Sequence, residues 1–242
     1  MLGLVAGAFV SAEVAVAQTS ADDRATALSI ATMLRSARSV IGSKQAEINE
    51  ASDGDKGLTG DVILAEAVEA YLSTAGKDPR EVDQASLEGK LLDAQMAAIV
   101  EIMDENQVTI NRPGVEFKGF VPAVFTRLVN ERFTEKVGDL AAIKVTAPLD
   151  LIRNRKARPD AWESGVIEDE LTAADWPRGE VFEDVAAVQG RDAYRMLMPE
   201  YYGEGCLSCH GAPAGDIDVT GYPKEGGALG DLGGVISITL FR

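Results

Sequence analysis

Histidine and cysteine are the scarcest chemistry-bearing residues of this 242-residue chain, which holds one histidine and two cysteines. All three fall within five positions near the C-terminus, as Cys206, Cys209 and His210 of the stretch CLSCH. A structural zinc site requires four protein ligands from cysteine and histidine, and this chain has three such residues in total. A carboxylate could complete a catalytic type of zinc site, but two cysteines this close to one histidine would be an odd ligand set. The clustering makes CLSCH the first candidate for a functional site.

Basic residues are also in short supply. The chain has 23 Lys and Arg against 39 Asp and Glu, which gives a formal charge of −16 and a sequence pI of about 4.5. Such a surface repels phosphate backbones and anionic lipid, so we expect no nucleic-acid partner and no binding to a membrane surface. The plainest interpretation of the acidity is that it keeps the protein soluble.

Long apolar runs are missing after the first residues. The stretch LGLVAGAFVSAEVAVA is shorter than the roughly 20 residues that span a membrane, and its end fits cleavage after Ala17 of a secretory signal peptide. No Lys or Arg precedes the run and Glu13 interrupts it; a start codon assigned too far downstream would explain the missing basic region. We therefore expect residues 1–17 to be a signal peptide and residues 18–242 to be one exported, soluble, periplasmic domain with no membrane span.

The hydrophobic pattern predicts helices first and strands later. Apolar residues recur at helical spacing over residues 20–49, 61–75 and 87–108 and in the stretch FVPAVFTRLVNERF, with Asp61 as an expected N-cap and Gly76 as a stop. After Gly138, the stretch AAIKVTAP predicts a short strand, EVFEDVAAV and DAYRMLMP predict a hairpin around Gly190, and GGVISITLF predicts a final strand. This order indicates an α+β domain with helices packed on an antiparallel sheet.

The CLSCH stretch has the C-x-x-C-H pattern of covalent c-type haem attachment. Two thiols three residues apart can bond to the two vinyl groups of one porphyrin edge, and the next residue then supplies the proximal imidazole to the iron. The main alternative is a structural or redox-active disulfide between Cys206 and Cys209 in an exported chain. A thioredoxin-like site would follow the first strand and precede a helix, whereas this motif follows a hairpin and precedes a glycine-rich loop. We therefore predict one covalently attached haem c, with His210 as the axial iron ligand.

A single histidine excludes bis-histidine coordination within one chain. The sixth coordination position of the haem iron is then left to Met, Lys, Tyr, the amino terminus, water, an exogenous ligand or a residue of another chain. Core packing is the favoured role for each methionine of the predicted mature chain, because methionine is a common gap filler, and Met33 and Met198 are the leading candidates if a methionine is the ligand. An open or water-occupied position is the other expectation.

With this motif in place, most of the predicted mature chain resembles the haem-c-binding, PAS-like periplasmic sensor domain family, formerly catalogued as a domain of unknown function. The resemblance is carried by the stretches ARSVIGSKQAEIN, FKGFVPAVFTRLVNERF, IKVTAPLDLIRNRKARPDAWE, YRMLMPEYYGEGCLSCHG and DVTGYPKEGGALGDLGGVISITLF. It implies a PAS-like antiparallel sheet, long N-terminal helices packed on it and haem c bound at the sheet.

The resemblance also implies roles for single residues. It assigns Cys206 and Cys209 to the thioether bonds and His210 to the iron. In some relatives a methionine from the N-terminal helix of a partner chain caps the iron, which makes Met33 the counterpart here and a homodimer one expected assembly. Other relatives use a cysteine at that place, and this chain has no third cysteine. Some relatives carry a fused output domain; this sequence ends at Arg242, so we expect a sensor of this kind to signal through an unidentified partner protein.

Two further groups of residues are candidates for contact with the haem. Arg153, Arg155 and Arg158 lie in the basic stretch LIRNRKARPDAWE and could neutralise the propionates, dock an acidic partner, bind an anion, or pair with nearby carboxylates. Tyr201 and Tyr202 could stack on the haem or hydrogen-bond to it, or simply pack. We expect the glycine-rich stretch GYPKEGGALGDLGG to fold over the haem edge, glycine permitting a close approach to the macrocycle.

Three functions then compete. The first is a periplasmic sensor of redox state or of a small ligand at the iron. The second is a periplasmic electron-transfer cytochrome c, in which the iron keeps six ligands in both oxidation states. An enzyme, such as a peroxidase-like catalyst, ranks last because the chain has no distal histidine to move protons.

Overall fold

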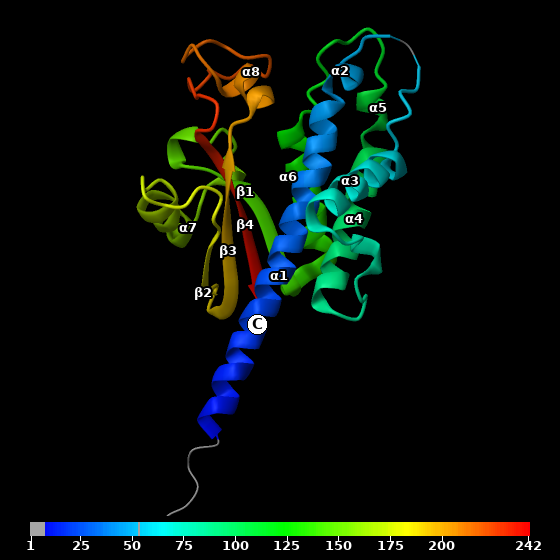
Figure 1. Ribbon diagram of the computed structural model, residues 1–242. Helices are drawn as coiled ribbons and strands as arrows, with labels where there is room; N and C mark the ends of the chain where they lie inside the picture. The colour runs from blue at the N-terminus through cyan, green and yellow to red at the C-terminus, as the bar shows by residue number, and fades with distance from the viewer. Residues whose placement is uncertain (1–7, 53) are drawn as a thin grey trace, which may run out of the picture.

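The computed structural model describes residues 8–52 and 54–242, with side chains from residue 21 onward. Figure 1 shows a helical layer lying beside a four-stranded antiparallel sheet, which confirms the α+β class predicted from the sequence. The predicted signal peptide, residues 1–17, lies outside the part with described side chains, so its cleavage stays a prediction. Within the described residues no helix is both long enough and apolar enough to cross a membrane.

The helical layer follows the predicted periodicity closely. It consists of α1 Ala8–Ser43, α3 Gly60–Ala75, α4 Leu87–Glu105 and α6 Pro122–Val137, with the single turns α2 Gln45–Ile48 and α5 Gln107–Ile110 after α1 and α4. The N-cap of α3 is Thr59, whose hydroxyl accepts from the Val62 amide, and not the predicted Asp61. Gly76 ends α3 as predicted, with φ of 70°.

The start of α3 is set by tertiary packing. A Cβ on Gly60 would lie 2.5 Å from the backbone oxygen of Val100, so only glycine lets α3 approach α4 this closely. The Gly60 amide donates to Asp104 Oδ1 at 2.8 Å, which satisfies one of the free amides of the first turn. The N-cap of α3 therefore lies two residues before the predicted Asp61.

The sheet contains the strands that the sequence predicts. These are β1 Ala141–Thr146, β2 Phe182–Val188, β3 Arg191–Tyr201 and β4 Leu232–Phe241, in the order β1-β4-β3-β2 with every neighbouring pair antiparallel. The hairpin between β2 and β3 turns at Gln189 and Gly190, with φ of 53° and 79°. Two successive positive φ angles match the right-handed twist of the flanking strands. The predicted turn around Gly190 is confirmed.

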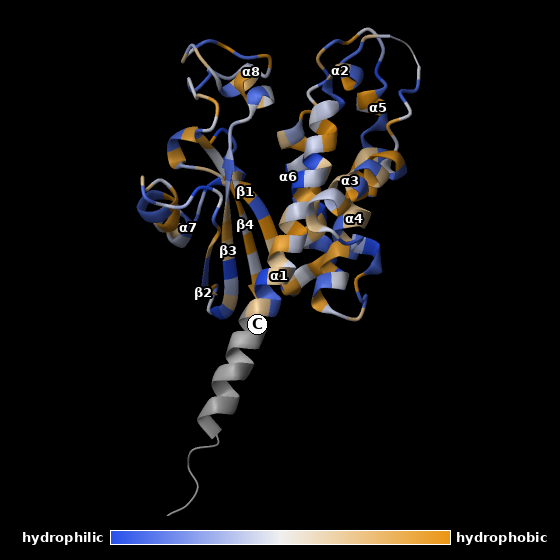
Figure 2. Ribbon diagram, in the orientation of Figure 1, coloured by the Kyte–Doolittle hydropathy of each residue, from blue (hydrophilic) through white to orange (hydrophobic). Residues whose placement is uncertain are grey.

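Both faces of the sheet are covered. Ile236, Ile238 and Leu240 of β4 point to one face, where they join the core shared with α1 and α6. Val235 points to the other face and packs against α7 Ala161–Val166 and the π-helical turn Ile167–Leu171. Figure 2 shows the apolar residues gathered where the helices meet the strands. The two-residue alternation along β4 thus separates two cores.

The helix α7 is a feature that the sequence pattern did not predict. Asp160 caps it and Glu163 completes a capping box. Glu163, 1% exposed, also accepts from Ser237 at 2.6 Å and pairs with Lys144 at 2.7 Å, while Arg195 pairs with Asp160 at 2.7 Å. These bonds tie α7 to the strands.

The CLSCH motif lies in the connection from β3 to β4. The chain leaves β3, forms the 3₁₀ turn Glu204–Cys206 and the single-turn helix α8 Leu207–His210, and returns through residues 211–231 to β4. In Figure 1, α8 stands at the same end of the molecule as α2 of the helical layer. The topology therefore places the motif opposite the C-terminal part of α1.

Candidate functional site

A short helical turn presents the three motif residues together. Cys206 directly precedes α8, and Cys209 and His210 belong to it, so the two thiols lie one turn apart. Gly211 ends the turn, and only glycine fits there, because a Cβ would lie 2.5 Å from the Leu207 carbonyl oxygen. Cys206 is exposed and Cys209 is partly exposed, and both are free thiols. Both sulfurs are thus open to reaction.

The ring of His210 is stacked on that of Tyr202, with 5.2 Å between centroids and 16° between planes. Glycines of the return loop and of β4 make this stack possible: a Cβ on Gly227 would lie 2.5 Å from the Tyr202 ring, and one on Gly233 in β4 would lie 2.2 Å from it. The Gly227 amide also donates to the His210 carbonyl at 2.8 Å. The close approach that these glycines permit is to the Tyr202 ring. Burial, followed by the charge of Glu225, raises the pKa of Tyr202 to about 12, so its hydroxyl stays protonated.

His210 Nδ1 lies 2.9 Å from Glu225 Oε2. A carboxylate there accepts a hydrogen bond from Nδ1–H, which fixes the tautomer and leaves Nε2 for a ligand bond. Burial would raise the pKa of Glu225, but its hydrogen bonds with Arg153 and His210 outweigh burial and lower it. Glu225 is therefore ionised at neutral pH and makes the imidazole a stronger electron donor.

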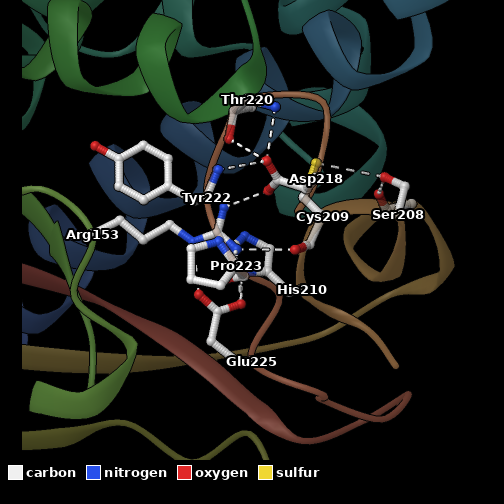
Figure 3. Close-up of polar contacts among 10 residues, drawn as sticks. Arg153, Ser208, Cys209, His210, Asp218, Thr220, Tyr222, Pro223 and Glu225 are labelled. Atoms are coloured by element: carbon white, nitrogen blue, oxygen red, sulfur yellow. Dashed lines mark hydrogen bonds and ion pairs between the residues drawn. The ribbon is translucent and has the colours of Figure 1, made fainter. Parts of the chain in front are cut away.

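Arg153 holds this arrangement together, as Figure 3 shows. Its guanidinium donates to both oxygens of Glu225 at 2.7 and 2.9 Å, to Asp218 Oδ2 at 2.6 Å and to the Cys209 carbonyl at 2.9 Å. Burial alone would lower the pKa of Arg153, and the bonds to Glu225 and Asp218 outweigh it and raise the pKa. One side chain thus joins the 149–157 segment, the motif and the return loop.

Asp218 is the most deeply enclosed carboxylate of this network, with 0% of its side chain exposed. Burial would raise its pKa, but hydrogen bonds from Thr220 and Arg153 and from the amides of Tyr222 and Thr220 lower it well below the ordinary range. The carboxylate is therefore ionised and fully bonded, and it fixes the tip of the return loop.

A groove with a volume of about 2000 Å³ runs between the motif and the helical layer. Its walls are α1, α6, the edge strand β1, the 151–157 segment and the motif itself, and Cys206, Cys209 and His210 all line it. Cofactor pockets in proteins commonly measure about 300–1000 Å³. The groove therefore has room for a macrocycle beside the motif.

Several buried polar atoms lining this groove have no hydrogen-bond partner within the described part of the chain. They are the hydroxyls of Thr126, Thr146 and Tyr202 and the amide oxygen of Asn130. Each of these residues is at most 7% exposed. Unpaired buried polar atoms are costly; the three hydroxyls can donate to a bound acceptor or water, and the Asn130 oxygen can accept from water. The two free thiols, the imidazole of His210 and the room in the groove fit a haem held by CLSCH.

The alternatives weighed for the motif find less support. Cys206 and Cys209 are not joined as a disulfide. Among the described residues there is no group of three or more His, Cys, Asp or Glu side chains that could hold a metal ion. A zinc site made from CLSCH and a nearby carboxylate is therefore not supported.

The structure does not bring the two methionine candidates to the groove. Met33 of α1 is 0% exposed and Met198 of β3 is 5% exposed, and both belong to the core between the helices and the sheet. Neither lines the groove. This placement favours the packing interpretation, and a role for either in capping an iron stays a prediction.

The remaining candidates are spread over the molecule. Arg155 and Arg158 are exposed and do not line the groove. The Tyr201 ring carries the Arg178 guanidinium 3.8 Å from its centroid, and its hydroxyl accepts from the Gly179 amide. Tyr202 lies beside His210, and Arg153 is bonded to the return loop. Contact of any of them with haem stays a prediction.

Sequence reasoning missed Glu225 as the partner of His210, and it missed Arg35 and Arg38 of α1, which line the groove opposite the motif. Glu225 lies in a glycine-rich loop, and a single acidic residue there carries no local signal. Arg35 and Arg38 lie three residues apart beside the apolar stripe of α1, and this spacing could have marked them as a pair.

Together these features define an α+β domain with a cysteine-histidine motif at the mouth of a deep groove. The Tll0287-like family model, described as Tll0287, matches residues 16–240. The chain therefore belongs to the Tll0287-like family. No curated protein and no solved structure gives a significant match.

Proposed function

We propose that this chain is a periplasmic c-type haem protein with a PAS-like sheet, which senses redox state or a small ligand. The observation that carries the proposal is the pairing of two free thiols with a histidine whose Nδ1 is bonded to Glu225, which leaves Nε2 for a ligand. Bound haem would supply an iron that changes oxidation state or takes up a ligand. Cys206 and Cys209 would hold it covalently, and His210 would be its axial ligand.

The residues around the motif would position this group. Glu225 and Arg153 fix the imidazole, and Tyr202 supports it from one side through ring stacking. The helical wall of the groove faces the motif. A ligand that entered the groove between this helical wall and a cofactor held by CLSCH would meet the side chains of the wall.

A sensor is favoured over an electron carrier by what lines the groove. Among the described lining residues there is no methionine, and CLSCH supplies the histidine and the cysteines. Lys144 and Lys156 line the groove too, but their ammonium groups are paired with Glu163 and Glu131. An electron carrier needs a strong sixth ligand in both oxidation states, and this lining offers neither a methionine nor a lysine that is free of an ion pair, which leaves tyrosine as the side chain able to bind iron.

The test is an optical spectrum of the mature protein, made in a host with haem-attachment machinery and recorded oxidised, reduced, and reduced under CO. A c-type spectrum that shifts with CO supports an accessible iron and a ligand sensor. A six-coordinate spectrum indifferent to CO favours a carrier or a redox sensor with a protein ligand. A spectrum without haem contradicts the proposal.

Glu225→Gln should raise the reduction potential of the bound haem by on the order of 60 mV, the change for a tenfold shift in a one-electron equilibrium. The carboxylate strengthens the imidazole as a donor and so favours the oxidised iron, whereas a neutral amide does this less. Spectroelectrochemical titration gives the value. Glu204→Gln is the matched control, because Glu204 is an exposed carboxylate two residues before Cys206. Equal potentials in the two variants would count against a role for Glu225.

A further inference from the structure

Two arginines on the groove-facing side of α1 share a single carboxylate. Arg35 Nε and Arg38 Nη2 bond to different oxygens of Glu200 at the end of β3, and Arg35 also donates to the Pro199 carbonyl at 3.0 Å. All three side chains line the groove. The cluster therefore holds two positive charges against one negative charge.

This excess positive charge is not fully neutralised. Burial lowers the pKa of Arg38, and repulsion from Arg35 lowers it further. A guanidinium carries five N–H donors, and Arg38 uses only Nη2 to bond Glu200. Most donors of Arg38 are therefore not occupied by that carboxylate. The side chains of Arg35 and Arg38 are 43% and 28% exposed, so these donors are accessible from the groove.

The charge of the groove as a whole is unusual for this protein. Six Lys or Arg and five Glu residues line the groove, whereas the whole chain has 23 basic and 39 acidic residues. The groove lining is therefore nearly balanced in charge within a chain of charge −16. Arg153 and Lys144 of this lining are paired with carboxylates outside it, whereas Arg35 and Arg38 share one carboxylate and keep a local excess of positive charge. A local positive charge attracts anions.

Two anionic groups could meet this pair in a haem-loaded groove. One is a haem propionate, and the other is a small ion that enters the groove from solvent. Arg38 and Cys206 both line the groove, so either group could reach the arginine. The experiment below distinguishes the two, because a propionate contact affects haem attachment and an ion site affects ligand affinity.

We propose that Arg35 and Arg38 form a binding site for a small anion on the wall of the groove that faces CLSCH. The planar guanidinium forks suit an anion with one or two acceptor atoms. The anion site rests on the proposed haem function only because the spectrum of the bound haem is used to detect the anion. If the protein is a sensor, the site makes its ligand an anion and not a neutral gas.

The test is an azide titration of the oxidised haem-loaded protein, followed by its optical spectrum. Arg38→Gln should raise the azide dissociation constant about tenfold or more, the effect of losing one hydrogen bond to a charged group. Arg155→Gln removes the same charge from an exposed residue outside the groove and should change it less than about twofold. Binding of CO to the reduced protein, a neutral probe, should be alike in all three proteins.

Each other result overturns the anion site. Equal weakening in Arg38→Gln and Arg155→Gln would mean that only the overall charge acts. A wild type that carries haem but does not respond to azide would remove the site and leave the haem proposal standing. Reduced haem attachment in Arg38→Gln with unchanged azide affinity would assign the arginine to a propionate. A wild type without haem would overturn both proposals.

Discussion

Replacing Cys206 and Cys209 together with alanine should abolish covalent haem attachment and leave the chain folded. Each thiol would form one thioether bond, so without both no bond survives denaturation. Neither sulfur is in a disulfide, and Cys206 is exposed, so the free energy of unfolding of the haem-free protein should change by only about 1 kcal/mol. A haem stain after denaturing electrophoresis measures attachment, and thermal melting followed by circular dichroism measures folding.

Ser208→Ala is the matched control, because Ser208 lies between the two cysteines and is exposed. It should attach haem as well as the wild type does. Each single alanine variant should retain at most one thioether bond and show reduced staining. Undiminished haem on the denatured double variant would refute the assignment of these thiols.

Replacing Arg153 with leucine should destabilise the protein by about 3 kcal/mol, because removing one partner of a buried ion pair leaves a charge unpaired in the interior. The side chain of Arg153 is 20% exposed and serves two carboxylates and the Cys209 carbonyl. Its loss should also free the loop around Glu225, and with it the orientation of His210. Chemical denaturation of the haem-free protein measures the first effect.

Arg155→Leu is the control for this prediction, since Arg155 lies two residues away and is exposed. It should change the free energy of unfolding by no more than about 0.5 kcal/mol. Arg153→Lys should recover only part of the loss, because an ammonium group cannot reproduce the planar fork that meets Glu225 with two bonds. If Arg153→Leu were as stable as Arg155→Leu, the network would have no structural role.

The main elements of the fold could be predicted because each has a strong local signal. The apolar stripe containing Ile30, Leu34 and Ile41 marks α1, and the final apolar run marks β4. Gly76 and Gly190 mark a helix end and a turn, where a positive φ favours glycine. Long helices and strands contain enough residues for the spacing of their apolar side chains to be recognised in the sequence.

Other features depend on partners far along the chain. The π-helical turn after α7 and the capping of α3 by Thr59 follow from packing that local patterns do not contain. Arg153 is separated by 65 and 72 residues from Asp218 and Glu225, so the sequence shows a basic stretch and not its acceptors.

The motif of the candidate site stands out in the sequence, whereas its surroundings do not. Scarcity and spacing identified Cys206, Cys209 and His210, because C-x-x-C-H is compact and specific. The carboxylate behind His210 and the arginines across the groove come from distant elements, and only the folded chain brings them to the motif. The burial of Met33 likewise follows from the packing of α1 against its neighbours.

The central claim is that CLSCH holds one haem c. The direct measurement is the pyridine haemochrome spectrum of the denatured wild-type chain after export in a host with haem-attachment machinery, combined with its intact mass. The account predicts one haem per chain that survives denaturation, with the spectrum of a porphyrin whose two vinyl groups are saturated. A chain with the mass of the polypeptide alone and no haemochrome spectrum would contradict it.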